Sequence, residues 1–248
     1  MTVGPGRAMP RRRLEGRAWT ALLVATLGAT LTVAGCGVAP IASEAATASL
    51  RATVSPSMAG LTAPAPAPPG TALVTVPEAG IALPVPDGWR QVSAADLADP
   101  AIRQDLATRY PGTGSLLEAA EAMGDRAEIA FLAVDPAAQR TGTVPASIAV
   151  LVSQPSVSGL LLELVSGFIS DGFQDVLGAG EPDRDRVGTP LGRAVRLAFA
   201  LPSSEPSEAL AWVVGAPAGT LLVSVMGPTS VLDSFDPDAL MAATTAVP

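Results

Sequence analysis

Apolar and polar residues alternate in short stretches of the chain from Ala72 onward. Such alternation is typical of β-strands, because successive side chains of a strand point to opposite faces of the sheet. The stretches with this pattern are 73–76, 81–85, 194–199, 210–214 and 221–225. The turn sequence Ala216 to Gly219 separates the last two stretches, and Glu78 to Gly80 separates the first two. The pattern therefore predicts two β-hairpins with a further strand at 194–199.

Two further stretches, 129–134 and 148–152, are apolar enough to be strands. The second is apolar at every position, as expected of a central strand that is covered on both faces. Asp99-Pro100 and Asp236-Pro237 have the residues that favour a helix start, an Asp cap followed by Pro. They predict helices to about Tyr110 and Thr244, and Ser115 with Glu118 forms a capping-box pattern for another short helix.

The longest predicted helix begins near Leu160. Its large apolar residues fall on one helical stripe: Leu160, Leu161, Leu164, Val165, Phe168 and Ile169. Small or polar residues fall on the other side: Glu163, Ser166, Gly167 and Ser170. An amphipathic helix normally turns its apolar stripe to the core. We therefore expect Leu164 and Phe168 to be core residues.

These elements predict a single α+β domain over residues 71–248. Its sheet is expected to be mainly antiparallel, because hairpins dominate the order of the elements. Helices that lie between the hairpins, together with a doubly buried strand, indicate that helices flank both faces of the sheet.

The N-terminal region has the three parts of a bacterial secretory signal. Five arginines lie before residue 18, an uncharged apolar segment covers 18–34, and Val33-Ala34-Gly35-Cys36 completes a lipobox. We expect cleavage between Gly35 and Cys36, with residues 1–35 as the lipoprotein signal peptide and Cys36 as the lipid attachment site. The alternative is a membrane-spanning anchor, for which the apolar segment is somewhat short of the usual 20 or so residues. Arg11-Arg12-Arg13 leaves both general secretory and twin-arginine export open.

Residues 36–70 are expected to form the lipidated cysteine and a disordered tether. Ala, Pro, Ser and Thr dominate this segment, and its only charges are Glu44 and Arg51. It has no apolar periodicity and ends in a proline-rich run, so it cannot bury enough surface to order itself. The lipobox and tether together predict a protein on the extracytoplasmic face of the cell membrane, bound to it through its N-terminal lipid.

Charge and composition narrow the class of partner. Beyond residue 35 the chain keeps 10 of its 15 arginines and 22 of its 23 acidic residues, a net charge of about −12. Such a chain repels nucleic acid and anionic lipid headgroups, so we expect no nucleic-acid partner, and we expect membrane adhesion to come from the acyl chains and not from a basic patch. All basic residues are Arg and none is Lys, which together with abundant Ala, Gly and Pro indicates a GC-rich, actinobacterial genome.

The chain has no His and only one Cys, which excludes Ser-His-Asp and Cys-His catalysis and ordinary zinc sites. Residues 181–188 resemble a calcium loop, but arginines interleave its acids and Gly192 stands where a closing Glu is needed. We interpret this segment as a surface loop. Ser156 and Ser158 lack the glycines of a nucleophile elbow. The sequence thus predicts no enzyme, no metal and no cofactor; the alternative is an unusual His-free envelope hydrolase that uses carboxylates.

The lipobox, the Pro/Ala tether, the hairpin that ends in Pro86-Asp-Gly-Trp-Arg90 and the order of later elements resemble the actinobacterial LpqN/LpqT-type lipoproteins. The resemblance covers roughly residues 73–247, in pattern more than in motif. It implies a PsbP-like α/β/α sandwich and a role as an accessory or binding protein of the cell envelope, with an envelope lipid or protein as partner. Trp89 and Arg90 are the candidate ligand-binding residues, if they line a groove between hairpin and helices; alternatively Trp89 plugs the sheet edge and Arg90 is solvated.

Overall fold

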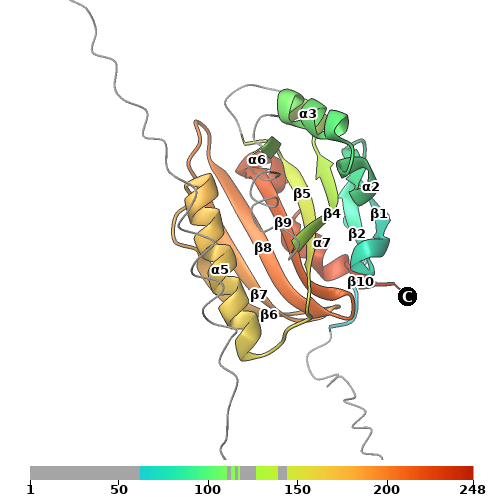
Figure 1. Cartoon of the computed structure of the whole chain (residues 1–248), viewed down its shortest axis with the longest axis vertical. Helices are drawn as coiled ribbons and strands as arrows, with labels where there is room; N and C mark the ends of the chain where they lie inside the picture. Colours follow the sequence, from blue (N-terminus) through green and yellow to red (C-terminus); the bar gives the residue numbers. More distant parts are fainter. Residues whose placement is uncertain (1–61, 111–112, 115–116, 118–126, 139–143, 248) are drawn as a thin grey trace, which may run out of the picture. The chain divides into compact units, whose positions relative to one another are not determined.

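The computed structural model describes residues 62–110, 113–114, 117, 127–138 and 144–247. Its main feature is a seven-stranded antiparallel sheet (Figure 1). In spatial order the strands are β3 (Arg90–Ser93), β4 (Ala127–Val134), β5 (Ser147–Ser153), β9 (Gly219–Pro228), β8 (Ser207–Ala216), β7 (Gly192–Leu201) and β6 (Asp183–Thr189). The hairpin predicted from 210–214 and 221–225 is confirmed as β8 and β9.

A second, three-stranded sheet has the order β1 (Thr71–Val76), β2 (Ile81–Pro86), β10 (Thr245–Ala246). Its first two strands confirm the other predicted hairpin, which they close through the 3-10 turn η1 (Pro77–Ala79). The helices are α2 (Ala94–Leu97), α3 (Pro100–Arg109), α5 (Leu160–Leu177), α6 (Thr229–Leu232) and α7 (Pro237–Ala243), and η3 (Pro136–Ala138) is a further 3-10 turn. The predicted starts of α3 and α7 are confirmed, because Asp99 and Asp236 accept hydrogen bonds from backbone N–H groups of the first turn.

The seven-stranded sheet separates two apolar cores. Helices α2, α3 and α5 contribute to the core on one face, while α6, α7 and the three-stranded sheet contribute to the core on the other. Strand β5 confirms the predicted doubly buried strand: Ala149 and Leu151 belong to the first core, and Ile148 and Val150 to the second. The fold class is therefore α+β, with a mainly antiparallel sheet flanked by helices, as the sequence predicts.

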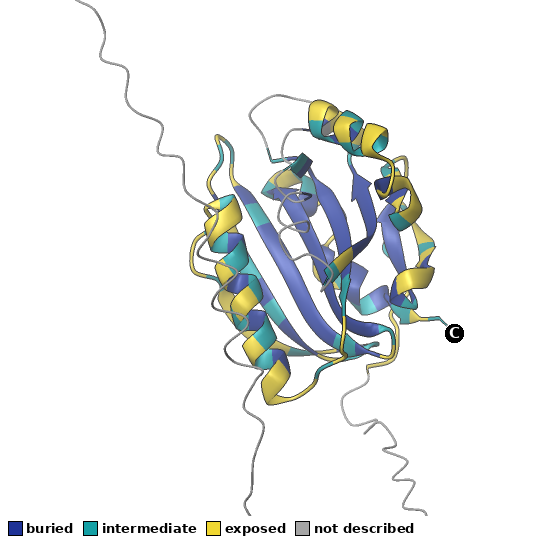
Figure 2. Cartoon of the chain, in the orientation of Figure 1, coloured by how far each residue is buried: buried dark blue, intermediate teal, exposed yellow. Residues whose placement is uncertain are grey.

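Helix α5 is where the prediction is wrong. Leu164 and Phe168, expected in the core, are 57% and 52% exposed, and Leu160 and Leu161 are exposed as well. The buried side chains of the helix are Leu162, Ser166, Ser170 and Phe173. Figure 2 shows the exposed residues along the outer side of α5, away from the sheet. Most of the predicted apolar stripe thus faces solvent; only Val165 and Ile169 pack, partly buried, against the core.

The inner face of α5 has a physical explanation. Phe173 stacks on Phe199 of β7, with ring centroids 4.9 Å apart, and so fixes which side of the helix meets the sheet. The inward hydroxyls are hydrogen bonded, as burial of polar groups requires: Ser166 Oγ donates to the Glu163 carbonyl, and Ser170 Oγ accepts from Gln174 Nε2. The small serines let the helix lie close to the sheet.

The segment 181–188, interpreted as a surface loop, is largely the edge strand β6, whose charged residues suit an exposed sheet edge. The helix predicted from Ser115 to about Met123 lies mostly outside the described residues.

The described chain begins at Thr62, nine residues before the predicted start of the domain at residue 71. These last residues of the predicted tether contact the domain. The Thr62 N–H donates to the Thr189 carbonyl at 3.2 Å, and the Ala65 N–H donates to the Ala242 carbonyl at 2.9 Å.

Candidate functional site

A groove of about 690 Å³ lies where the N-terminal end of α5 meets the β6–β7 edge of the sheet. Helix α5 packs along β7 and β8, next to β6 (Figure 1). The residues that line the groove are Thr62, Gly159, Leu160, Leu162, Glu163, Arg186, Val187, Gly188, Arg193, Ala194 and Val195. Its volume falls within the range of small-molecule binding sites, and most of its lining surface is apolar.

Arginines lie along the outer border of this groove. The pairing of β6 with β7 sets Arg186 opposite Val195 and Gly188 opposite Arg193. Val195 and Leu197 belong to the core beneath α5, so Arg184, Arg186 and Arg193 lie on the α5 side of the sheet. Arg186 Nε reaches Glu163 Oε1 of the helix at 2.5 Å, while most of its side chain stays exposed. The groove therefore combines mostly apolar lining residues with two arginines and with Glu163, which pairs with Arg186.

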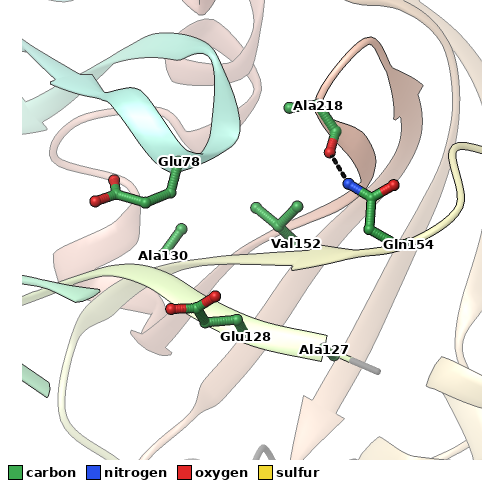
Figure 3. A pocket seen from close by; sticks show the side chains of 7 residues that line it. All are labelled: Glu78, Ala127, Glu128, Ala130, Val152, Gln154 and Ala218. Carbon is green, nitrogen blue, oxygen red and sulfur yellow. Dashed lines mark hydrogen bonds between the residues drawn. The ribbon is translucent and has the colours of Figure 1, made fainter. Parts of the chain in front are cut away.

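A second, smaller pocket of about 210 Å³ lies near the turn between β8 and β9 (Figure 3). Glu78 and Glu128 lie on one side of it, and the Gln154 amide donates a hydrogen bond to the Ala218 carbonyl on the other. Ala130 and Val152 lie between them. This pocket is lined by two carboxyl groups, so it is the one of the two pockets that bears on the carboxylate-hydrolase alternative.

The structure does not bring the candidate residues Trp89 and Arg90 together at a groove. Trp89 packs edge-on against Phe235, with ring centroids 5.5 Å apart, in the core beneath α6 and α7. Arg90 instead reaches α3, where its Nη1 lies 2.8 Å from Asp105 Oδ2. Neither residue lines either of the two pockets. The alternative, in which Trp89 plugs the sheet edge and Arg90 is solvated, does not describe Arg90 either, because its side chain is paired with Asp105.

Asp105 joins two arginines on this side of the domain. Besides Arg90, it accepts a hydrogen bond from Arg109 Nε at 2.6 Å. The Arg90 hydrogen bond is the main cause that holds the pKa of Asp105 below its usual value, and Arg109 adds to it. The same contact raises the pKa of Arg90. The pair ties β3 to α3, so its charge state bears on the stability of this corner.

We expect the stability of Asp105→Asn to fall less between pH 5 and pH 3 than the stability of the native chain. Because the folded-state pKa of Asp105 is lowered, its contribution is present above the unfolded value of about 3.9 and is lost as pH falls through the folded value. Urea midpoints at pH 5 and pH 3 should therefore differ less in Asp105→Asn than in the native chain. Asp175→Asn, at an exposed aspartate of α5, is the control, and an identical acid limb in all three proteins would contradict the prediction.

The remaining sequence candidates are easily placed. Among the described residues, no group of three or more Asp, Glu, His or Cys side chains could hold a metal ion. Ser156 and Ser158 lie in the connection between β5 and α5. Cys36 and the predicted signal peptide, residues 1–35, lie outside the described residues. No helix in the described part of the chain combines the length and apolarity needed to cross a bilayer.

Comparison with known proteins adds no identity. The chain matches no known protein family, and no curated protein matches it significantly.

The groove was missed by sequence reasoning because its walls come from Thr62, from the start of α5 and from β6–β7, which are far apart in the chain. The one available signal was the pair Arg184 and Arg186 at period-two spacing, which marks one face of a strand.

Proposed function

We propose that this protein is a lipid-anchored lipoprotein on the extracytoplasmic face of the cell membrane, with a noncatalytic domain that binds an apolar ligand of the cell envelope. The groove beside α5 is the observation that carries the proposal. A binder needs a concave, mostly apolar surface with a few polar contacts, and the groove has both. The resemblance to LpqN/LpqT-type lipoproteins implies the same kind of role.

The chemistry of the chain supports binding over turnover. Without His or Lys, and with its only Cys assigned to the lipid, it lacks the usual general bases and nucleophiles for neutral pH. Its groove offers the guanidinium groups of Arg193 and of Arg186, which also pairs with Glu163, and guanidinium groups suit the binding of an anionic group. An amphiphile with an apolar body and an acidic end fits this combination.

A groove-filling variant tests the binding proposal. Gly188 lines the groove, and a residue at this position of β6 projects to the same face as Arg186. We expect the full chain with Gly188→Trp to lose the ligand that the native chain retains from an envelope lipid extract, as measured by native mass spectrometry. Arg184→Trp, on the same face but outside the groove lining, is the matched control. Equal retention by all three chains would contradict the proposal.

Activity measurements separate binding from the hydrolase alternative. The purified chain should show no esterase, peptidase or glycosidase turnover. The alternative gains support only if turnover is present and a single carboxyl substitution in the smaller pocket, Glu78→Gln or Glu128→Gln, removes it while the fold stays intact.

A further inference from the structure

The outer face of α5 is unusually apolar for a surface helix. Six large hydrophobic side chains are exposed in the described part of the chain, and five of them belong to α5. They are Leu160, Leu161, Leu164, Phe168 and Val176. Single exposed hydrophobic residues are ordinary, whereas a cluster on one element marks a surface that binds something. The inner face of the helix already packs on the sheet, so the fold does not need this outer stripe.

Charge is distributed unevenly around the stripe. Four of its residues, Leu160 to Phe168, occupy the N-terminal half of the helix, and this half lies beside the arginine-bearing β6–β7 edge. On the same outer side, the C-terminal half carries the exposed Asp171 and Asp175. The N-terminal half of α5 is therefore apolar and flanked by arginines, of which Arg186 pairs with Glu163 of the same half, whereas the C-terminal half carries two exposed aspartates. An interfacial helix combines an apolar face with basic flanking residues in this way.

The tether reaches the domain at the apolar end of α5. Thr62 is hydrogen bonded to Thr189 at the end of β6, and it lines the same groove as Leu160. Only 25 residues separate it from Cys36. A chain anchored through Cys36 thus holds the N-terminal half of α5 within reach of the membrane surface.

From these observations we infer that the N-terminal half of α5 lies in the anionic headgroup region of the membrane that carries the lipid anchor. Leu160, Leu161, Leu164 and Phe168 insert into the interface, and the arginines of β6 and β7 contact lipid phosphates. Asp171 and Asp175 keep the C-terminal half in water. The inference rests on the proposed lipid anchor, and it places the mouth of the groove next to the lipids. A second copy of the chain suits the stripe less well, since in an antiparallel helix pair the leucines would face the partner copy's acidic half.

A fluorescent reporter on the stripe tests the inference. The only native thiol is blocked once Cys36 is acylated, so Leu161→Cys provides a single labelling site for the environment-sensitive dye NBD. The matched control is Leu73→Cys on β1, because the two leucines are 58% and 57% exposed. The acylated full chain is reconstituted on vesicles of phosphatidylcholine with phosphatidylglycerol, and on phosphatidylcholine alone.

We expect the dye at position 161 to shift to the blue and to be quenched by lipids with brominated acyl chains, more strongly with phosphatidylglycerol. The dye at position 73 should do neither. Adding Leu164→Asp and Phe168→Asp should abolish the response at 161, and replacing Arg184, Arg186 and Arg193 by Gln should remove its dependence on phosphatidylglycerol. All the substituted side chains are exposed, so each variant is expected to stay folded. Thermal unfolding checks this for each variant.

Several results would overturn the inference. No response at 161, or equal responses at 161 and 73, would show that the stripe does not lie on the bilayer. A response that persists without vesicles and rises with protein concentration would assign the stripe to a second copy of the chain. Vesicle flotation separates this failure from failure of the proposed anchor: a native chain that does not float removes both, whereas one that floats without a dye response removes only the α5 contact.

Discussion

Phe173→Ala is expected to destabilise the domain far more than Phe168→Ala, although both residues lie on α5. Phe173 is only 9% exposed and stacks on Phe199, so its truncation leaves a cavity and should cost about 3–5 kcal/mol of unfolding free energy. Phe168 is 52% exposed, and its loss should cost less than about 1 kcal/mol. Urea unfolding of the two full-length variants measures the difference.

A second pair of substitutions, at leucines instead of phenylalanines, tests whether the difference depends on burial and not on the aromatic side chain. Leu162→Ala removes a buried leucine and Leu164→Ala an exposed one, two residues apart on the same helix. Leu→Ala in a core typically costs about 2–5 kcal/mol, so only the first should lower the unfolding midpoint strongly. If both members of each pair lost the same unfolding free energy, the outer face of α5 would have to be covered by another part of the protein.

Local patterns were sufficient to predict most of the sheet. Strands such as 210–214 and 221–225 are specified by period-two alternation, and the turn residues between them set which strands pair. Helix starts at Asp99 and Asp236 were equally predictable, since a cap depends on residues within one helical turn. The PsbP-like relationship stays a prediction, because the comparisons found no match that bears on it.

The phase of α5 could not be predicted by counting apolar residues, because this helix is apolar on more than one face. Leu160, Leu161, Leu164 and Phe168 form the larger stripe, but Leu162 and Phe173 fit the space above β7 and β8. Which stripe turns inward depends on Phe199 and on the close approach that Ser166 and Ser170 allow, both tertiary effects. Strand β6 was not predicted either, because its charged sequence is typical of a surface loop as well as of an exposed edge strand.

The candidate site shows the limit of reasoning from neighbours in sequence. Trp89 and Arg90 are adjacent residues, yet they contact different parts of the fold, since Trp89 packs with Phe235 and Arg90 pairs with Asp105 of α3. The groove depends instead on segments more than 90 residues apart, from Thr62 to Gly159, which only folding brings together. Net charge was also too coarse a guide, because an acidic chain still concentrates three arginines beside one helix.

Cys36→Ser is expected to abolish lipid attachment altogether and to leave an unprocessed precursor. Acylation needs the thiol of the lipobox cysteine, and Cys36 is the only cysteine in the chain. A serine cannot take the thioether-linked lipid, so cleavage before residue 36 should fail and the signal peptide should remain. Fractionation alone cannot reveal this, because the uncleaved apolar segment 18–34 would still hold the chain in the membrane.

Intact mass and the N-terminal sequence are therefore the decisive measurements for this substitution. The native chain should begin at Cys36 and carry the mass of its lipid, whereas Cys36→Ser should begin at residue 1 or 2 without added mass. Adding Ser43→Cys to Cys36→Ser is the control: it restores a thiol downstream of the small residues at 33–35 and should restore neither cleavage nor lipid. Masses for the native chain and Cys36→Ser that differ only by the exchange of sulfur for oxygen would favour the membrane-spanning anchor.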